Sequence, residues 1–139
     1  MKKTETELAW LAGIIDGEGN VALYPKVGGV DARISIASTN KRLVDEVERI
    51  LSQHSIKYGV ASNEKKNKNH KKAYYVNVCR GESLEKLIPL VVQHLIIKGE
   101  VAKVVLNWVL ARKGGKLMGK KEEDILRDYK FIKEYTNLI

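Results

Sequence analysis

The chain has 139 residues and a formal net charge of +8 at pH 7, from 25 Lys and Arg against 17 Asp and Glu, so a polyanion is the first partner to consider. Apolar residues make up 44% of the sequence, which excludes wholesale disorder, and the single cysteine, Cys79, excludes a disulfide framework and a cysteine-based zinc site. Because the chain has neither an apolar run of about 18 residues nor the apolar core of a signal peptide, we expect a soluble intracellular protein with one domain over residues 1–139.

The first predicted element is a helix over residues 5–16 that is apolar on almost every side. A helix without a wet face has to be buried on more than one side. The pattern ends at Gly17-Glu18-Gly19, where glycines permit the backbone conformations that terminate helices. The apolar residues of this helix are Leu8, Ala9, Trp10, Leu11, Ala12, Ile14 and Ile15.

Two short alternating runs then predict a β-hairpin. Val21 and Leu23 alternate with polar or small residues, and Ile34 and Ile36 do the same after a turn at residues 27–31. Each strand of the hairpin therefore has one apolar face and one polar or basic face.

A helix and a second hairpin follow. Asn40 is expected to cap the helix, because apolar residues recur at helical spacing over residues 43–51. The second hairpin enters through residues 56–60 and leaves through residues 74–78. Its tip, residues 64–72, holds five lysines and one acid.

Three more helices are predicted after the second hairpin. Ser83 is expected to cap the first of them, and Pro89 to kink or restart it. The second covers residues 100–112, and the third runs from about residue 122 to the end with Tyr135 on its buried side. The order is therefore αββαββα plus C-terminal helices, which predicts an α+β fold with one four-stranded antiparallel sheet backed by helices on its apolar face.

The stretch from Leu11 to Gly19 reads LAGIIDGEG and closely resembles the signature of the LAGLIDADG homing endonucleases. The predicted order αββαββα is also the core order of that family, so the resemblance covers essentially the whole chain. It implies that the four-stranded sheet is saddle-shaped. A single copy of the motif resembles the homodimeric branch of the family.

Small residues form a stripe along the motif helix, because Ala9, Gly13 and Gly17 are four residues apart. Small residues let two helix backbones approach closely. The pattern by itself leaves two partners open, namely a second copy of the helix across a two-fold axis or the core of the same chain. The resemblance favours the homodimer, with an interface at Ala9, Ala12, Gly13, Asp16 and Gly17.

The resemblance implies a metal-dependent nuclease site at the end of this helix. The second acid of the motif, Glu18, matches the metal ligand of the family, and the carbonyl of Gly17 matches a supporting ligand. Such oxygen donors suit Mg²⁺, for which Mn²⁺ or Ca²⁺ substitute in binding. The first acid, Asp16, is an anion at a helix C-terminus, so we expect it to have a structural role and a hydrogen-bonding or basic partner. The alternative for Glu18 is a solvated surface glutamate.

Two further catalytic positions follow from the resemblance. Lys98 ends a segment that starts at Pro89 and resembles the P-x-L-…-K pattern of the family, in which a lysine supports the nucleophilic water or the transition-state charge. The alternative is a surface lysine at a helix start. Ser38, at the end of the second strand, takes a position that is commonly glutamine, and its shorter side chain would need a bridging water.

The sheet face opposite the helices is the expected surface for double-stranded DNA, because a curved antiparallel ribbon fits the major groove. The residues expected on this face are Ala22, Tyr24, Lys26, Arg33, Ser35, Ala37, Asn63, Tyr75 and Asn77. Lysines at the second hairpin tip are expected to contact phosphates, the alternative being a solubilising loop. These lysines are Lys65, Lys66, Lys68, Lys71 and Lys72.

In function, the resemblance implies a homodimeric, Mg²⁺-dependent endonuclease that cuts both strands of a long, nearly palindromic DNA site and is encoded within an intron or intein. No nucleotide-binding loop is present, so no nucleotide cofactor is expected, and neither is a membrane partner. The expected location is the cytoplasm or nucleoid of a prokaryote, or an organelle matrix. The alternatives are a maturase-like RNA-binding protein on the same scaffold and a DNA-binding protein with a decayed active site.

Overall fold

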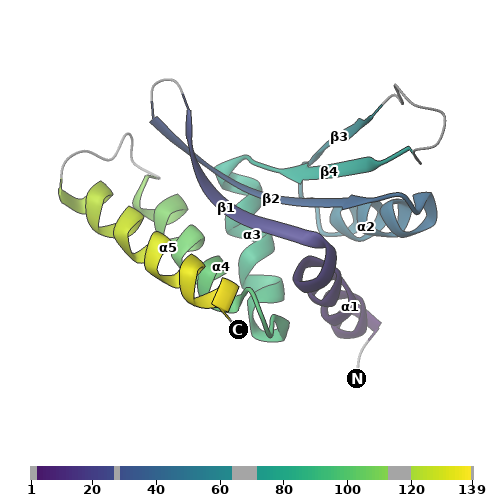
Figure 1. The fold of residues 1–139 in the computed structure, drawn as a ribbon. Coiled ribbons are helices and arrows are strands. Elements are labelled where there is room, and N and C mark those ends of the chain that lie inside the picture. The colour runs from purple at the N-terminus through teal and green to yellow at the C-terminus, as the bar shows by residue number, and fades with distance from the viewer. Residues whose placement is uncertain (1–2, 27–28, 64–71, 113–119, 139) are drawn as a thin grey trace.

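The computed structural model describes residues 3–26, 29–63, 72–112 and 120–138. They form a mixed α+β fold in which helices cover one face of a four-stranded sheet (Figure 1). The predicted order, αββαββα followed by C-terminal helices, is confirmed. The elements are α1 (Lys3–Glu18), β1 (Gly19–Lys26), β2 (Gly29–Ser38), α2 (Lys41–Gln53), β3 (Gly59–Ser62), β4 (Tyr74–Val78), α3 (Gly81–Val91), the short 3₁₀ helix η1 (Val92–His94), α4 (Gly99–Ala111) and α5 (Lys120–Leu138).

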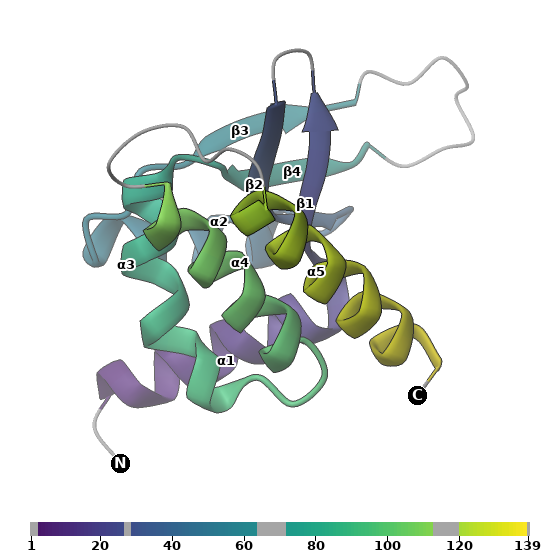
Figure 2. The same ribbon diagram turned by 90° about the vertical axis from the view of Figure 1, so that its left-hand side faces the viewer.

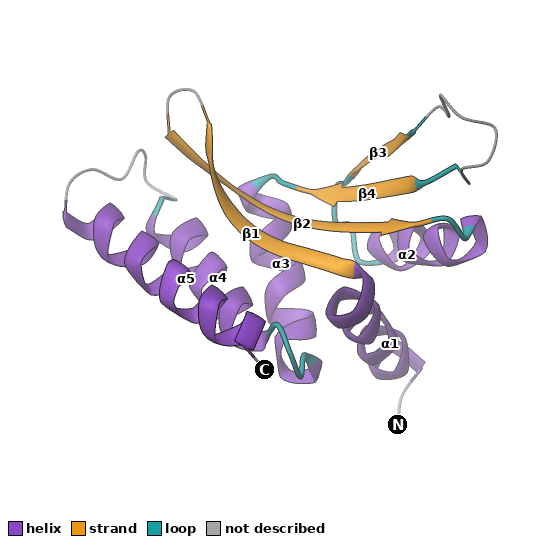
Figure 3. Ribbon diagram, viewed as in Figure 1, coloured by secondary structure: helices purple, strands orange, loops and turns teal. Residues whose placement is uncertain are grey.

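The four strands form one antiparallel sheet in the order β1-β2-β4-β3, so β1 and β3 are its edges. Alternate residues of the central strands, such as Ile34 and Val76, are buried against the helices, as their apolar pattern predicts. The sheet lies as one layer above the helices, with the turn end of β1 and β2 rising on the left and β3 rising on the right (Figure 3). The face away from the helices is therefore concave and open.

The turn between β1 and β2 is shorter than the sequence pattern predicts. The prediction was a turn at residues 27–31, whereas β2 begins at Gly29 and pairs this residue with Lys26. Gly29 has a φ of +153°, which L side chains rarely adopt. A glycine here lets strand pairing begin directly after residues 27–28, which lie outside the described residues.

One of the two predicted helix caps is correct. The side chain of Asn40 accepts a hydrogen bond from the backbone N–H of Leu43 at 3.2 Å, and α2 begins at the next residue. Ser83 does not cap α3, because the helix begins at Gly81 and Ser83 is buried in its first turn. Pro89 lies inside α3, which continues to Val91 before η1 begins, so the proline does not end the helix at once.

The last helix, α5, packs on α4, and its C-terminal turns extend past that helix (Figure 2). Ile125, Leu126, Tyr129 and Ile132 lie against the core. The prediction that Tyr135 is buried is wrong, since this residue is 58% exposed where α5 has passed beyond the core. Among the described ranges, neither α5 nor any other helix is both long and apolar enough to cross a membrane.

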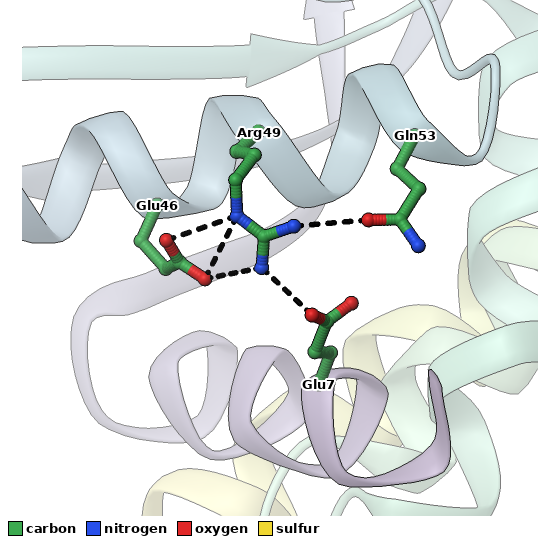
Figure 4. Close-up of polar contacts among 4 residues, drawn as sticks. All are labelled: Glu7, Glu46, Arg49 and Gln53. Atoms are coloured by element: carbon green, nitrogen blue, oxygen red, sulfur yellow. Dashed lines mark hydrogen bonds and ion pairs between the residues drawn. The ribbon is translucent and has the colours of Figure 1, made fainter. Parts of the chain in front are cut away.

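A polar cluster joins α1 to α2 (Figure 4). Arg49 donates from Nη2 to Glu7 Oε1 at 2.8 Å, from Nη1 to Gln53 Oε1 at 2.9 Å, and from Nε to both oxygens of Glu46 at 3.1 Å. The hydrogen bonds from Arg49 lower the pKa of Glu46 below its ordinary value, and those to Glu46 and Glu7 raise the pKa of Arg49. We call these four residues the Arg49 cluster.

Candidate functional site

The end of α1 and the start of β1 meet at a corner without a connecting loop, because the helix runs to Glu18 and the strand begins at Gly19. The predicted end of the helix at residues 17–19 is confirmed, but neither Gly17 nor Gly19 has the positive φ that glycine permits at helix ends. Among the described residues only Gly29 and Ser55 have positive φ. Gly19 is needed for a different reason: a Cβ there would lie 2.7 Å from the carbonyl oxygen of Ile15. A Cβ on Gly17 would meet nothing within 4 Å.

Glu18 occupies this corner with its side chain exposed, and it has no hydrogen bond or ion pair within the described residues. The backbone carbonyls at a helix C-terminus carry a negative partial charge. The exposed carboxylate of Glu18 and the neighbouring backbone carbonyls are oxygen donors of the kind that suit a hard divalent cation. No group of three or more His, Cys, Asp or Glu is assembled in the described part of the chain. A cation here would therefore need further ligands from backbone, water, phosphate or a second chain.

Asp16 has the structural role expected for it. Its carboxylate accepts hydrogen bonds from the backbone N–H groups of Ile96 at 2.7 Å, Ile97 at 3.2 Å and Lys98 at 2.9 Å. These groups precede α4, so the last turn of α1 holds the segment that leads into a helix 80 residues later. The carboxylate of Asp16 is thus used inside the chain, and its place in a helix–helix interface stays a prediction.

The exposed face of α1 does not include every residue that was predicted for the dimer interface. Ala12 is 0% exposed and belongs to the core of the chain, so it does not lie on the open face of the helix. Gly13 and Gly17 are exposed, and a Cβ on Gly13 would also meet nothing within 4 Å. Packing within the chain therefore gives no reason for these two glycines.

Lys98 lies at the C-terminal end of α1, as a role at this corner requires. Its Nζ donates to the carbonyl oxygen of Asp16 at 2.5 Å, and its backbone N–H is held by the carboxylate of the same residue. Asp16 therefore positions Lys98 at two points. A cation at this place also complements the negative end of the helix.

A second lysine, Lys133 of α5, reaches the same corner from the C-terminal helix. Its Nζ donates to Asn20 Oδ1 at 3.2 Å and to the carbonyl oxygen of Val21 at 3.1 Å. Burial, and secondarily the charge of Lys98, lowers the pKa of Lys133 below its ordinary value. The two ammonium groups thus bind the backbone on either side of Glu18, one before it and one after it.

Sequence reasoning missed Lys133 and Asn20. Asn20 directly follows the motif and has the same parity as the polar residues of β1, so alternation alone could have included it. No local signal marks Lys133, because it is one of many lysines in the chain and only the packing of α5 brings it to the corner.

Ser38 is engaged elsewhere. Its Oγ accepts a hydrogen bond from the backbone N–H of Asn40 at 3.0 Å, which shapes the turn into α2. Register places Ser38 beside Tyr74, on the same side of the sheet as the buried Ile36 and Val76. Among the described residues no direct hydrogen bond joins Ser38 to Glu18 or Lys98. Ile36, two residues before Ser38, pairs with Gly19, so Ser38 lies at the end of β2 nearest the corner and its role there stays a prediction.

The residues expected on the open face of the sheet are placed there by the strand register. The cross-strand pairs that share this face are Ala22 with Arg33, Tyr24 with Asp31, Ser35 with Asn77, and Ala37 with Tyr75. The guanidinium of Arg33 lies 4.7 Å from the centroid of the Tyr24 ring. Asn63, which follows β3, lies on the same face, because its Nδ2 donates a hydrogen bond of 2.7 Å to the Tyr75 hydroxyl.

The lysines predicted to contact phosphate are only partly described. Lys72 is exposed, with its Nζ 5.5 Å from the centroid of the Tyr74 ring. The backbone of Lys26 pairs within β1, but its side chain lies outside the described residues. The other four predicted lysines also lie outside them, namely Lys65, Lys66, Lys68 and Lys71.

Comparison with known proteins agrees with this architecture. A family model described as a LAGLIDADG-like domain matches residues 5–91. An uncharacterised protein of Methanocaldococcus jannaschii is 36% identical over 67 residues, which are 48% of this chain and 25% of that protein. The chain therefore spans about a quarter of the length of the curated relative that it matches.

Two solved structures share the fold. The archaeal intron-encoded homing endonuclease I-Vdi141I, complexed with DNA, has a TM-score of 0.72 and 17% identity, covering 95% of this chain and 85% of that one. The homing endonuclease I-CvuI, in complex with its target in the presence of Ca, has a TM-score of 0.64 and 20% identity, covering 97% of this chain and 82% of that one. These likenesses establish the fold, with its four-stranded antiparallel sheet and flanking helices.

Proposed function

Because the chain belongs to the family of LAGLIDADG-like domains, we propose that it is a site-specific homing DNA endonuclease, a homodimer that hydrolyses one phosphodiester bond in each strand of double-stranded DNA. The corner between α1 and β1 carries this proposal. There the carboxylate of Glu18 is exposed without a partner in the described chain, and the ammonium group of Lys98 binds the same helix end. Both solved structures described above are complexes of homing endonucleases with DNA.

The groups that would hold a divalent cation are the carboxylate of Glu18 and the carbonyl of Gly17. Both are hard oxygen donors of the kind that Mg²⁺ and Ca²⁺ prefer, and we propose Mg²⁺ as the cofactor for cleavage. A divalent cation bound there stabilises negative charge on the oxygens of the phosphate. The residues that surround it have to position that phosphate and neutralise its charge.

Lys98 is the residue suited to bind the reacting phosphate. Its ammonium group has three donors, and one of them is used on the carbonyl of Asp16. Those that remain can donate to phosphate oxygens as negative charge develops in the transition state. Asp16 keeps this lysine in place without touching the substrate, since its carboxylate binds the backbone before α4.

The open face of the sheet is suited to the major groove. Arg33 offers the planar donor pattern that binds guanine edges, and the Tyr24 ring beneath it holds the guanidinium in place. Asn63, Tyr75 and Asn77 add amide and hydroxyl groups on the same face. Lys72 and the other lysines of the second hairpin tip would contact the DNA backbone.

Dimerisation through α1 is supported by what its outer surface presents. Trp10 is 37% exposed on the helix, and beside its C-terminal end Ile96 is 91% exposed and Ile97 48% exposed. Large apolar side chains grouped around two glycines without an internal packing partner suit a second copy of the same helix. A dimer would place one Glu18 at each of the two strands to be cut.

The dimer can be tested at Gly13. Gly13 is exposed, and a Cβ there meets nothing within 4 Å in the single chain. Because Gly13→Leu also removes a helix-interior glycine, we expect it to raise the stability of the chain by up to about 1 kcal/mol while weakening self-association at least tenfold. Sedimentation equilibrium measures the association, and Asn107→Leu, at an exposed position of α4, is the matched control. Unchanged self-association of Gly13→Leu would contradict an interface on this stripe.

The cleavage proposal is tested with a library of randomised DNA duplexes incubated with the purified protein and Mg²⁺, followed by sequencing of the cut ends. We expect both strands to be cut at one recurring site, and removal of the cation with EDTA to abolish cutting. A competition for binding between the recovered duplex and structured RNA should favour the duplex. Preference for RNA, with no cutting of any duplex, would contradict the proposal.

A further inference from the structure

The C-terminal helix reaches the proposed catalytic corner, although α5 lies outside residues 5–91 that the family model matches. Two of its side chains, one helical turn apart, interact with the edge strand β1. Tyr129 interacts with the backbone of Leu23, and Lys133 binds Val21 and Asn20. An edge strand leaves a row of backbone groups unpaired, so these contacts cover the edge as well as fixing α5.

Lys133 keeps a donor for a ligand. Its ammonium group has three N–H bonds, of which two are directed at Asn20 Oδ1 and the carbonyl of Val21. The third has no partner within the described residues. Asn20 is exposed and has the parity of the open sheet face, so the ammonium group of Lys133 lies at the boundary between the edge of β1 and that face.

The two ammonium groups near the corner are suited to bind an anion. Both Lys98 and Lys133 are held against backbone carbonyls, and the charge of Lys98 contributes to lowering the pKa of Lys133. Of the two neighbouring acids, Asp16 is already used by three backbone N–H groups, whereas Glu18 is the proposed cation ligand. Two ammonium groups bound to the backbone before and after Glu18 are suited to donate to one phosphate group, another oxygen of which would bind a cation held by Glu18.

We propose that Lys133 is a second phosphate-binding residue of the active site, donating from α5 to an oxygen of the phosphate that Lys98 also binds. This inference rests on the proposed nuclease function, since it requires a DNA phosphate at the corner. It assigns α5 a part in the reaction beyond covering the edge of the sheet.

A purely structural role for Lys133 makes a different prediction. If the residue only ties α5 to β1, removing the other tie with Tyr129→Phe should have the same effect as removing Lys133. If Lys133 binds phosphate, Tyr129→Phe should leave the chemistry unchanged and Lys133→Arg should retain most of it, because arginine keeps a charge and donors.

The experiment measures single-turnover cleavage of the recovered DNA site at saturating protein, together with affinity for that site in Ca²⁺ at several salt concentrations. We expect Lys133→Gln to lower the cleavage rate about 10- to 100-fold and to reduce the slope of log affinity against log salt by about 1. Tyr129→Phe and Lys133→Arg should remain within about threefold of the unmodified chain. Lys130→Gln, at an exposed lysine of the same helix, is the matched control and should also stay within this range.

Three results would overturn the inference. Cleavage by Lys133→Gln at the unmodified rate would remove Lys133 alone and leave the nuclease function in place. Equal losses in Lys133→Gln and Tyr129→Phe, with lowered melting temperatures in both, would assign the residue to the attachment of α5. Failure of the unmodified chain to cut any duplex would remove the nuclease proposal and this inference with it.

Discussion

The two ends of α1 carry charged groups that differ in how completely they are paired. Near its first turns the Arg49 cluster is closed, because one guanidinium binds Glu7, Glu46 and Gln53 (Figure 4). At its last turn the corresponding group is open, since Glu18 is exposed without a partner within the described residues while lysines bind the backbone on both sides of it.

The pKa shifts in the two groups run in opposite directions. In the closed cluster the pKa of Glu46 is lowered and that of Arg49 raised, so each residue holds its charge more firmly than in water. At the open corner the pKa of Lys133 is lowered, so this charge is held at a cost that a bound anion would relieve. Closed pairing indicates a role in stability, and open, unbalanced charge indicates a role in binding or catalysis.

The largest expected effect comes from replacing Glu18, the acid at the C-terminal end of α1, with glutamine. We expect Glu18→Gln to lower cleavage at least about 1000-fold, because the carboxylate that would hold the cation is lost while the shape is kept. Binding of the DNA site in the absence of cleavage should change little. Glu5→Gln, at an exposed glutamate of the same helix, is the control for surface charge. Cutting by Glu18→Gln at the unmodified rate would remove this residue from the active site.

The second effect separates the glycines on either side of Glu18. Gly19→Ala should lower the free energy of unfolding by about 2 kcal/mol, because the new Cβ would meet backbone atoms of Ile15 that cannot move alone. Gly17→Ala should not destabilise the chain, since its Cβ enters open space. Urea unfolding of both variants measures the difference, and equal stability of the two would contradict the described corner.

A third effect concerns the closed cluster. Arg49→Met should lower the melting temperature by roughly 5 °C, because Glu7 is nearly buried and its Oε2 already lacks a partner among the described residues. Cleavage at a temperature well below the transition should be unaffected. The comparison between the two ends of α1 would fail if this variant lost cleavage while keeping its melting temperature.

The smallest effect is on the acid side of the stability curve. The pKa of Glu46 is below its unfolded value of 4.5, so its contribution to stability is complete above that pH and is lost as the pH falls through the folded pKa. In Arg49→Met the largest cause of this shift is lost, and the fall in melting temperature between pH 7 and pH 3 should be smaller by about 1–2 °C. Thermal unfolding of both proteins at several pH values measures the change. If the melting temperatures of the two proteins fell equally from pH 7 to pH 3, Arg49 would not be the cause of the lowered pKa of Glu46.

Local sequence patterns correctly predicted the elements that have one buried and one exposed face. The alternation of Ile34 and Ile36 predicted which face of the sheet is buried, and Asn40 predicted the start of α2. The same patterns gave wrong predictions where one residue type occurs in more than one structural role. Ser83 is a good cap by composition, yet it packs inside α3, and Ala12 is small like Gly13, yet it belongs to the core.

What the sequence determined by itself is the order of elements, the two faces of the sheet and the acidic end of the motif helix, because each depends on spacing between near neighbours. Only the tertiary structure decided that Asp16 holds the segment before α4 and that Lys133 reaches the corner beside Glu18. These contacts join residues that are far apart in the chain or depend on which way a helix turns its faces. Such contacts arise only when the whole core has packed, and no local periodicity records them.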